Sequence, residues 1–508
     1  MMQSTTHEQN DRHVLPKGWV WTTIGEVALL NPNHSAAGIP GDTEVSFLPM
    51  KSVEEQTGRI NLSSTKKYAE ARRGYSTFAD GDIIFAKITP CMENGKIAVV
   101  DHLKNGVGCG STEFHVIRPV KGIVSAKLIL FHLFRQGFRE QAQKQMTGSA
   151  GQLRVPVKFL ESTSIPIPPI NEQHRIVAKI EDLFTKLDAG VETLKKVKAQ
   201  MKRYRQAVLK AAFEGKLTEE WRKAHKGQLE LASALLERIK EERKKALGKK
   251  YKELPPLDMS ELPKLPDEWC WTLLETILID ARYGTSKKCS QEKIGLAVLR
   301  IPNIVEGEID YANLKFTDLS KSEESTLSLK PGDILVIRTN GSLELVGRTA
   351  IFRGQHRIYA FASYLIRIRT AYPAQLGSFV NRYFLSKWVR NFIERNARTT
   401  AGQYNINLNI LGSIPIPLPS AEEQQQIYSE IDRDFSVADE IEKIVEQTLT
   451  QSQRLRQTIL KTAFEGKLVP QDPNDEQAEK LLERIKQEKA KNQQKLIKEK
   501  RRDNGRQS

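Results

Sequence analysis

The chain has 508 residues, of which 39% are hydrophobic and 28% charged, and its formal net charge is +16. This length predicts more than one independently packed core, and the composition excludes a largely disordered chain. The surplus of Lys and Arg favours a polyanionic partner, with nucleic acid ahead of a membrane surface.

The N-terminus and the cysteines indicate the compartment. Residues 1–14 form a polar stretch without the apolar core of a signal peptide, and we expect them to be disordered. No run of about 18 apolar residues marks a membrane-spanning helix. The four cysteines show neither a CxxC pair nor metal-ligand spacing with histidine, so we expect reduced thiols and no metal site. These features predict a cytoplasmic protein.

Residues 15–169 predict a mixed α/β domain. Short apolar runs, such as those from Asp82 to Ile88 and from Phe114 to Ile117, are separated by Gly, Pro and Asn turns, and this pattern is typical of strands. An amphipathic stretch from about Ala126 to Gln145 predicts a helix. The domain ends near Ile165-Pro-Ile-Pro168, where proline prevents a helix from continuing.

Residues 170–253 predict a helical region with one long coiled-coil helix and a shorter helix from about Leu229 to Leu247. From Asn171 to Phe213 there are 43 positions. A continuous helix of this length would reach roughly 65 Å at about 1.5 Å per residue. Apolar or small residues recur along one face at steps of three and four. This seam contains Ile176, Ile180, Leu183, Leu187, Leu194, Val197, Met201 and Val208.

A proline-rich linker over residues 254–264 leads to a second domain and a second helical region. Residues 265–419 contain strand candidates at 334–338, 349–352 and 360–368 and a helix at about 375–395, so this domain is also mixed α/β. Residues 420–502 are again helical, with a further helix at about 476–500, and residues 503–508 are expected to be disordered. The second seam contains Ile427, Ile431, Ala438, Val445, Ser452, Leu455 and Ile459.

The two halves of the chain repeat each other. Leu15-Pro-Lys-Gly-Trp19-Val-Trp21 returns 250 residues later as Leu265-Pro-Asp-Glu-Trp269-Cys-Trp271. Gly81-Asp82-Ile83 and Ala150-Gly151-Gln152 return 251 residues later. This period predicts a tandem duplication of one domain plus one helical region. If an approximate twofold rotation relates the copies, the two seams pair antiparallel and place the domains at opposite ends of a rod.

The motifs of common catalytic sites are absent from the sequence. Gly106-Val-Gly-Cys-Gly110 lacks the GxGxxG spacing of a cofactor turn, and Asn31-Pro-Asn-His34 only superficially resembles the catalytic loop of an amino methyltransferase. Gly215-Lys216 and Gly466-Lys467 lack the Ser or Thr of a nucleotide-binding loop and are better explained as ends of helices. No HExxH or GxSxG motif is present. We therefore expect no catalytic residues and no cofactor bound by this chain.

The duplicated motifs resemble those of the specificity subunits of type I restriction-modification systems. They are the Leu-Pro-x-x-Trp-x-Trp openings, the Gly-Asp-Ile strands, Ile-Pro-Ile-Pro followed by Glu172-Gln173 or Glu423-Gln424, and the helix ends Phe-Glu-Gly-Lys-Leu. The resemblance covers nearly the whole chain, and each motif occurs twice.

This resemblance implies a fold and a set of partners. The expected fold is α/β, with two mixed α/β target recognition domains separated by long antiparallel coiled-coil helices in a tandem pseudo-twofold duplication. Each domain would read one half of a bipartite, asymmetric site in double-stranded DNA. Two modification (methyltransferase) subunits, which bind S-adenosylmethionine and methylate adenine, would join this chain. Two restriction (motor-nuclease) subunits, which use ATP and magnesium, would complete the complex.

Loops after the Gly-Asp-Ile strands and around the Ala-Gly-Gln segments carry the candidate DNA-binding residues. Arg and Lys pair with guanine, Asn and Gln pair with adenine, and phosphates accept hydrogen bonds from almost any donor. The tryptophans of the two openings are expected to pack within the protein rather than to stack on a base, because they stand where each domain begins. The candidates are Lys87, Asn94, Lys96, Gln152, Arg154, Arg338, Asn340, Arg348, Arg398, Gln403 and Tyr404.

Two other functions stay open from the residues alone. In one of them, the chain is the recognition part of a self-contained restriction-modification enzyme, which would act on DNA without partners. Alternatively, it is a coiled-coil scaffold that assembles proteins without binding DNA, and its basic charge is incidental. A scaffold of this kind would lack the steep salt dependence that accompanies phosphate contacts.

Overall fold

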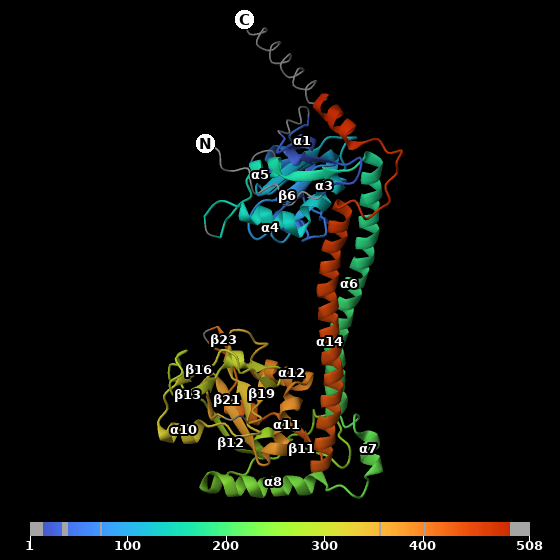
Figure 1. The fold of residues 1–508 in the computed structure, drawn as a ribbon. Coiled ribbons are helices and arrows are strands. Elements are labelled where there is room, and N and C mark those ends of the chain that lie inside the picture. The colour runs from blue at the N-terminus through green and yellow to red at the C-terminus, as the bar shows by residue number, and fades with distance from the viewer. Residues whose placement is uncertain are drawn as a thin grey trace. The chain divides into compact units, whose positions relative to one another are not determined.

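The structure is a computed structural model that describes residues 14–32, 39–71, 74–149, 151–354, 357–400 and 402–487, with Thr400 described by its backbone only. The ends expected to be disordered, residues 1–14 and 503–508, lie outside these ranges except for Val14. The chain divides into two units: unit 1 comprises residues 1–194 and 447–508, and unit 2 comprises residues 195–446. Each unit joins one α/β domain to a part of each long helix (Figure 1). The domain boundaries given above stay predictions.

Two four-stranded sheets form the α/β domain of unit 1. The central strand β6 is buried on both faces, because Ile83 and Phe85 pack into one core whereas Ile84 and Ala86 pack into another. The first sheet is antiparallel throughout, and the second contains one parallel pair, β3 with β8. In sheet order, the strands are β2 (Ala28–Leu30), β9 (Phe114–Pro119), β6 (Ile83–Ala86) and β7 (Ile97–Val99), and then β4 (Thr65–Lys67), β3 (Glu44–Leu48), β8 (Val107–Gly110) and β5 (Ser76–Ala79).

The α/β domain of unit 2 has a corresponding central strand, β17 (Ile334–Ile337), which also divides its side chains between two cores. The predicted strand at 360–368 is two strands in different sheets, because the chain turns where Leu365 N donates to Ala362 O. In sheet order, the strands are β12 (Leu278–Tyr283), β21 (Leu365–Thr370), β17 and β19 (Thr349–Ile351); β16 (Lys315–Thr317), β13 (Leu296–Leu299) and β20 (Tyr359–Phe361); β14 (Ile304–Val305) and β15 (Glu308–Ile309); and β18 (Thr339–Asn340), β23 (Gln403–Asn405) and β22 (Arg398–Thr400).

The prediction of one continuous helix after the last long strand of each domain was wrong. Each stretch forms two helices, because Arg135 and Ser386 adopt extended backbone conformations. The hydroxyl of Ser386 accepts a hydrogen bond from Val389 N and so begins a new helix. The helices of the domains are α3 (Ala126–Leu133), α4 (Gln136–Lys144), α5 (Val157–Ser162), α10 (Lys321–Leu327), α11 (Pro373–Phe384), α12 (Lys387–Asn396) and α13 (Leu408–Gly412), with the single turns α1 (Ile24–Val27), α2 (Tyr68–Ala71) and α9 (Leu274–Ile277).

A two-stranded antiparallel sheet ties the start of each domain to its end. In unit 1, β1 (Val20–Thr23) pairs with β10 (Ser164–Ile167), and in unit 2, β11 (Cys270–Leu273) pairs with β24 (Pro415–Leu418). The tryptophan-rich openings thus lie against the Ile-Pro-Ile-Pro segments. A two-stranded sheet accommodates these prolines because each strand has a free edge.

The long helices α6 (Ile170–Phe213) and α14 (Ala421–Phe464) each contain 44 residues. In unit 1, Asp188 of α6 forms an ion pair with Arg456 of α14. In unit 2, Lys198 pairs with Glu446 at 2.8 Å, and Arg205 pairs with Asp439 at 2.6 Å. Residue numbers rise along α6 as they fall along α14, so the helices pair antiparallel in each unit, as predicted.

Most of the predicted seam is apolar and buried, with one correction. Ile176, Ile180 and Ile459 belong to the core of unit 1. Leu455, however, is 48% exposed, and the prediction for this residue was wrong. The neighbouring Arg456 takes the inward position instead, with its guanidinium 4.2 Å from the centre of the Phe184 ring. Stacking on the ring and pairing with Asp188 together favour arginine at this position.

Shorter helices follow each long helix. In unit 2 these are α7 (Glu219–Ala224) and α8 (Ala232–Leu247), and α8 buries Leu235 and Ile239 in the core of that unit. In unit 1, residues 478–487 are helical and bury Leu481 and Ile485. The rest of the helix predicted to reach residue 500 lies outside the described residues. The helix α8 therefore has a counterpart in unit 1.

Candidate nucleic-acid interface

The Gly-Asp-Ile motif of each domain is part of the framework that holds the candidate surface. Asp82 is 1% exposed and accepts two hydrogen bonds of 2.6 Å from Arg118. Asp333 is fully buried and accepts hydrogen bonds of 2.6 and 2.7 Å from Arg369. These pairs fix β6 and β17, and the candidates Lys87 and Arg338 directly follow these two strands.

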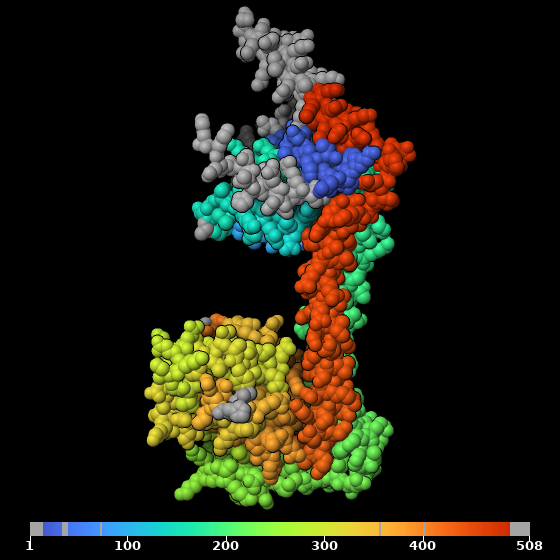
Figure 2. All heavy atoms as spheres, viewed as in Figure 1, coloured from blue at the N-terminus to red at the C-terminus, as the bar shows by residue number. Residues whose placement is uncertain are grey.

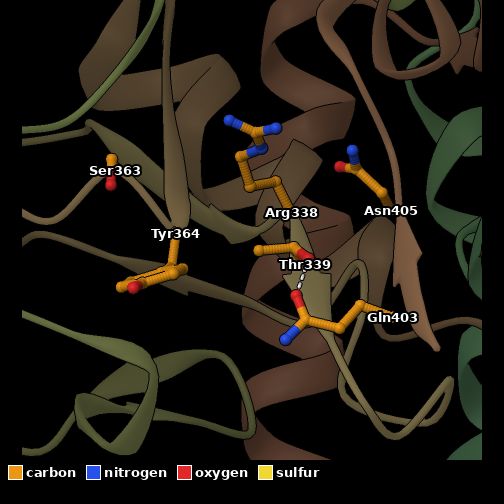
Figure 3. Close-up of a pocket in the computed structure, with 6 residues that line it drawn as sticks. All are labelled: Arg338, Thr339, Ser363, Tyr364, Gln403 and Asn405. Carbon is orange, nitrogen blue, oxygen red and sulfur yellow. Dashed lines mark hydrogen bonds between the residues drawn. The ribbon is translucent and has the colours of Figure 1, made fainter. Parts of the chain in front are cut away.

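In unit 2, a surface pocket forms beyond the end of β17. It has a volume of about 300 Å³ and is lined by six residues. Strand pairing brings its walls together, because Thr339 of β18 lies opposite Asn405 of β23. Figure 3 shows side chains from these neighbouring strands and from the turn before β21 around one opening. The lining residues are Arg338, Thr339, Ser363, Tyr364, Gln403 and Asn405.

The pocket contains polar groups without partners. The guanidinium of Arg338 lies 4.4 Å from the centre of the Tyr283 ring. Within the described part of the chain, its buried Nε has no hydrogen-bond acceptor, and the buried Oδ1 of Asn405 has no donor. Thr339 Oγ1 donates to Gln403 Oε1 at 3.2 Å, which occupies the amide oxygen of Gln403 (Figure 3). The pocket lining thus contains one donor and one acceptor that the described residues leave unpaired.

The structure therefore brings together two of the six candidates in the second domain, Arg338 and Gln403. Tyr404 packs against the hydrophobic core, because alternate residues of a strand face opposite sides. Asn340 Oδ1 accepts from Ser342 N at 2.8 Å and so holds a turn. Arg348 and Arg398 are exposed outside the pocket, and Arg398 pairs through its backbone with Asn405.

The corresponding surface of unit 1 is formed by residues 251 positions earlier in the sequence, and its side chains differ in charge and hydrogen bonding. Isolated bridges join Ile88 and Thr147 to Arg154, matching the three-stranded arrangement of unit 2. Arg154 donates from Nε and Nη2 to Glu113 at 2.8 and 2.9 Å. These hydrogen bonds hold the pKa of the Glu113 carboxyl below its usual value, so the pair is ionised and its charges balance.

Three of the five candidates in the first domain lie on this surface. Arg154 is one of them, and Lys87 holds it in place through Val155 N, which donates to Lys87 O at 2.9 Å. Gln152 is exposed. Asn94 and Lys96 lie on the chain segment between β6 and β7, where Asn94 Nδ2 donates to Glu55 Oε1 at 2.9 Å.

Sequence reasoning missed five residues of these surfaces: Glu113, Thr339, Ser363, Tyr364 and Asn405. The ring of Tyr364 is an exposed aromatic group, with 56% of the residue accessible. The repeat could have identified two of them. Asn405 lies 251 positions after the candidate Arg154, and Tyr364 lies 251 positions after Glu113. Candidate residues in one domain identify their counterparts in the other.

Other kinds of site find no support in the described residues. No group of three or more His, Cys, Asp or Glu side chains among them is placed to hold a metal ion. Over the same residues, no helix is both long and apolar enough to cross a bilayer.

Comparisons with known proteins point to one family. The family model described as "Type I restriction modification DNA specificity domain" matches residues 16–200 and 278–451. The specificity subunit of the type I restriction enzyme EcoEI from Escherichia coli is 30% identical over 478 residues, covering 84% of this chain and 79% of the relative.

Two solved structures share the fold. A chain of a type I R-M system aligns with a TM-score of 0.61 at 20% identity, covering 90% of this chain and 100% of the other. The HsdS subunit from Thermoanaerobacter tengcongensis aligns with a TM-score of 0.52 at 20% identity, covering 90% and 99%. The likeness in fold therefore extends over nearly the whole length.

Proposed function

The chain belongs to the family of type I restriction-modification DNA specificity domains, as a specificity subunit that confers DNA sequence specificity, and we propose that its two α/β domains read the two halves of a bipartite, asymmetric site. One observation carries the proposal. Positions related by the repeat form a polar surface at the same strand ends in both units, with Arg338, Tyr364 and Asn405 in unit 2 where unit 1 has Lys87, Glu113 and Arg154. Equivalent surfaces with unlike donors and acceptors fit unlike half-sites.

The chain acts on DNA through partners and has no catalytic role of its own. The proposed partners are two modification subunits, which use S-adenosylmethionine to methylate adenine, and two restriction subunits, which use ATP and magnesium. In its sequence the chain carries none of the common catalytic motifs. Its four cysteines are free thiols, which supports the cytoplasmic location expected from the sequence.

The antiparallel helix pair sets the distance between the two half-sites. Each long helix contains 44 residues, which corresponds to a length of roughly 66 Å at about 1.5 Å per residue. Proteins that read two half-sites commonly meet them about one turn of DNA apart, roughly 34 Å. A helix pair of this length is sufficient for such a spacing.

Mapping of methylated adenines across the genome of the host tests this proposal. We expect one motif made of two different short sequences separated by a fixed number of unspecified base pairs. Deletion of this chain should abolish methylation at that motif. A palindromic motif, or unchanged methylation after deletion, would contradict the proposal.

Assays with the purified chain separate the proposal from its alternatives. Incubated alone with DNA, magnesium, ATP and S-adenosylmethionine, the chain should neither cleave nor methylate, and activity without partners would identify a self-contained enzyme. Binding to DNA should weaken steeply as salt rises, because phosphate contacts release counterions. Absence of any salt-dependent binding, in the chain and in its complex, would favour the protein scaffold.

A further inference from the structure

The pocket of unit 2 is positively charged, and the described residues provide no acceptor for Nε of its arginine, Arg338. Arg338 is the one charged residue among the six that line it. Two other arginines of this domain are neutralised, since Arg367 pairs with Asp280 and Arg369 with Asp333. No such carboxylate lies within ion-pair distance of Arg338 in the part of the chain that the structure describes. A ligand with hydrogen-bond acceptors would therefore complete this site.

The guanidinium of Arg338 is held in place before any ligand binds. Its plane is supported by the ring of Tyr283, 4.4 Å away. Its backbone is fixed on both sides, because Arg338 N donates to Tyr364 O at 3.0 Å and Ile406 N donates to Arg338 O at 2.9 Å. A planar fork with a fixed position binds two adjacent acceptors at a small cost in conformational entropy.

We propose that this pocket receives a G·C base pair of the second half-site, with Arg338 donating to O6 and N7 of guanine and Asn405 Oδ1 accepting from the amino group of cytosine. In the major groove, a G·C pair presents two acceptors on guanine followed by one donor on cytosine. The pocket offers both complementary kinds of group among the described residues: a guanidinium whose buried Nε has no acceptor, and a buried amide oxygen, Asn405 Oδ1, that has no donor. Figure 3 shows both side chains at the same opening.

A DNA phosphate is the other acceptor-rich group that Arg338 could bind, and the two differ in a measurable way. A phosphate offers no donor for Asn405 Oδ1, whereas the cytosine amino group does. A phosphate contact also carries no base identity, so its loss weakens binding to all sequences alike. A base contact changes the preference at one position.

Unit 1 provides a matched control, because its equivalent surface is chemically different. Lys87 stands at the position of Arg338, and the position of Asn405 is held by Arg154, which is already paired with Glu113. The structure thus predicts that the two domains read different base pairs at equivalent points. Lys87→Ala should alter the first half-site alone.

This inference rests on the proposed function, and selection from randomised DNA tests both. The complex is purified from host cells through a tag on the full chain, as wild type, Arg338→Ala, Asn405→Ala and Lys87→Ala, and bound duplexes are sequenced. In Arg338→Ala, one position of one half-site should lose its preference for guanine by roughly 5- to 150-fold, whereas the other half-site stays unchanged. Asn405→Ala should weaken the preference at the same position.

Each other result contradicts a specific claim. Equal weakening for all sequences in Arg338→Ala, with a smaller dependence on salt, would show a phosphate contact and overturn the assignment of a base pair. An unchanged profile would overturn any role for the pocket in binding. A wild-type complex without a bipartite preference would overturn the proposed function itself. Thermal unfolding of each variant, compared with wild type, shows whether the domain stays folded.

Discussion

The indole Nε1 of Trp19 donates a hydrogen bond of 3.0 Å to Oε2 of Glu172, and the same contact joins Trp269 to Glu423 at 2.8 Å. Both indoles and both carboxyls are buried. In each case, a residue from the opening of the domain binds the first turn of a long helix. The packing role expected for Trp19 and Trp269 agrees with their burial, and the contact fixes each α/β domain to its helix.

The two carboxyls have different surroundings, and Glu423 is the better satisfied one. It also accepts from Arg222 Nη1 at 2.6 Å and from Thr218 Oγ1 at 2.7 Å. The positions 251 residues after Thr218 and Arg222 are Val469 and Pro473, which offer no side-chain donor to Glu172. Oε1 of Glu172 has no hydrogen-bond partner among the described residues.

Glu423→Gln should destabilise unit 2. The substitution removes the charge that balances the buried guanidinium of Arg222, and loss of one partner from a buried ion pair costs about 2 to 4 kcal/mol. Denaturant unfolding of the full chain at neutral pH measures the effect. Glu220→Gln is the matched control, because Glu220 is exposed and its ion pair is with Lys223 on the surface. Equal stability of the two variants would show that Arg222 does not depend on Glu423.

Glu172→Gln should change how stability depends on pH. Burial raises the pKa of the Glu172 carboxyl above its ordinary value of 4.5, against the opposing hydrogen bond from Trp19. The folded state therefore holds this proton more tightly than the unfolded chain does. Stability from this group is fully present below pH 4.5 and is lost as the pH rises through the higher pKa of the folded state.

Thermal unfolding of both proteins between about pH 4 and pH 8 measures this dependence. The melting temperature of Glu172→Gln, relative to wild type, should increase as the pH rises and then level off. Glu181→Gln, which alters an exposed residue of the same helix, should show no such trend. Parallel profiles for Glu172→Gln and wild type would mean that the carboxyl is not buried as described.

Gly332→Ala should destabilise the chain more than Gly81→Ala, although the two glycines begin the same motif. Both have a positive φ, 89° and 88°, and an alanine in this conformation costs about 1 to 2 kcal/mol. A Cβ on Gly332 would also lie 2.4 Å from the carbonyl oxygen of Pro373, whereas a Cβ on Gly81 would meet nothing within 4 Å. The clash should add about 1 to 3 kcal/mol. Denaturant unfolding compares them, and equal losses would refute the contact with Pro373.

Much of the fold was predictable because the repeat and the hydrophobic periodicity are local properties of the sequence. Both long helices follow from apolar residues at steps of three and four, and the antiparallel pairing follows from the duplication. The breaks at Arg135 and Ser386 were not predictable, since the amphipathic pattern continues across them. The inward position of Arg456, in place of Leu455, was not predictable either, because it depends on contacts with Phe184 and Asp188 of α6.

The candidate surface was predicted only in part, for a related reason. Arg338 and Gln403 were chosen for their residue types and their place after a strand or within a motif. Asn405 joins them because β18 pairs with β23 across more than sixty positions of sequence. Such long-range pairing has no local signal. Tyr364 lies in the turn between β20 and β21. The sequence did not predict this turn, because the apolar residues around it were interpreted as one strand over residues 360–368.

Removal of one heptad from both long helices should shorten the gap between the half-sites without changing either half. Deleting residues 190–196 and 448–454 keeps the pairs Asp188–Arg456 and Lys198–Glu446 on either side of the cut. Seven residues correspond to a helix length of about 10 Å, and thus to about three base pairs of DNA. Because seven residues are close to two full turns, the buried faces of both helices stay in phase.

Methylation mapping in cells that carry the deletant measures the new gap. Replacement of residues 190–196 by seven residues of equal helical propensity is the control, and it should leave the gap unchanged. If the deletant is folded and methylates at the original spacing, the helix pair does not set the distance. If the bases within a half-site change instead, the α/β domains are not independent of the helices that hold them.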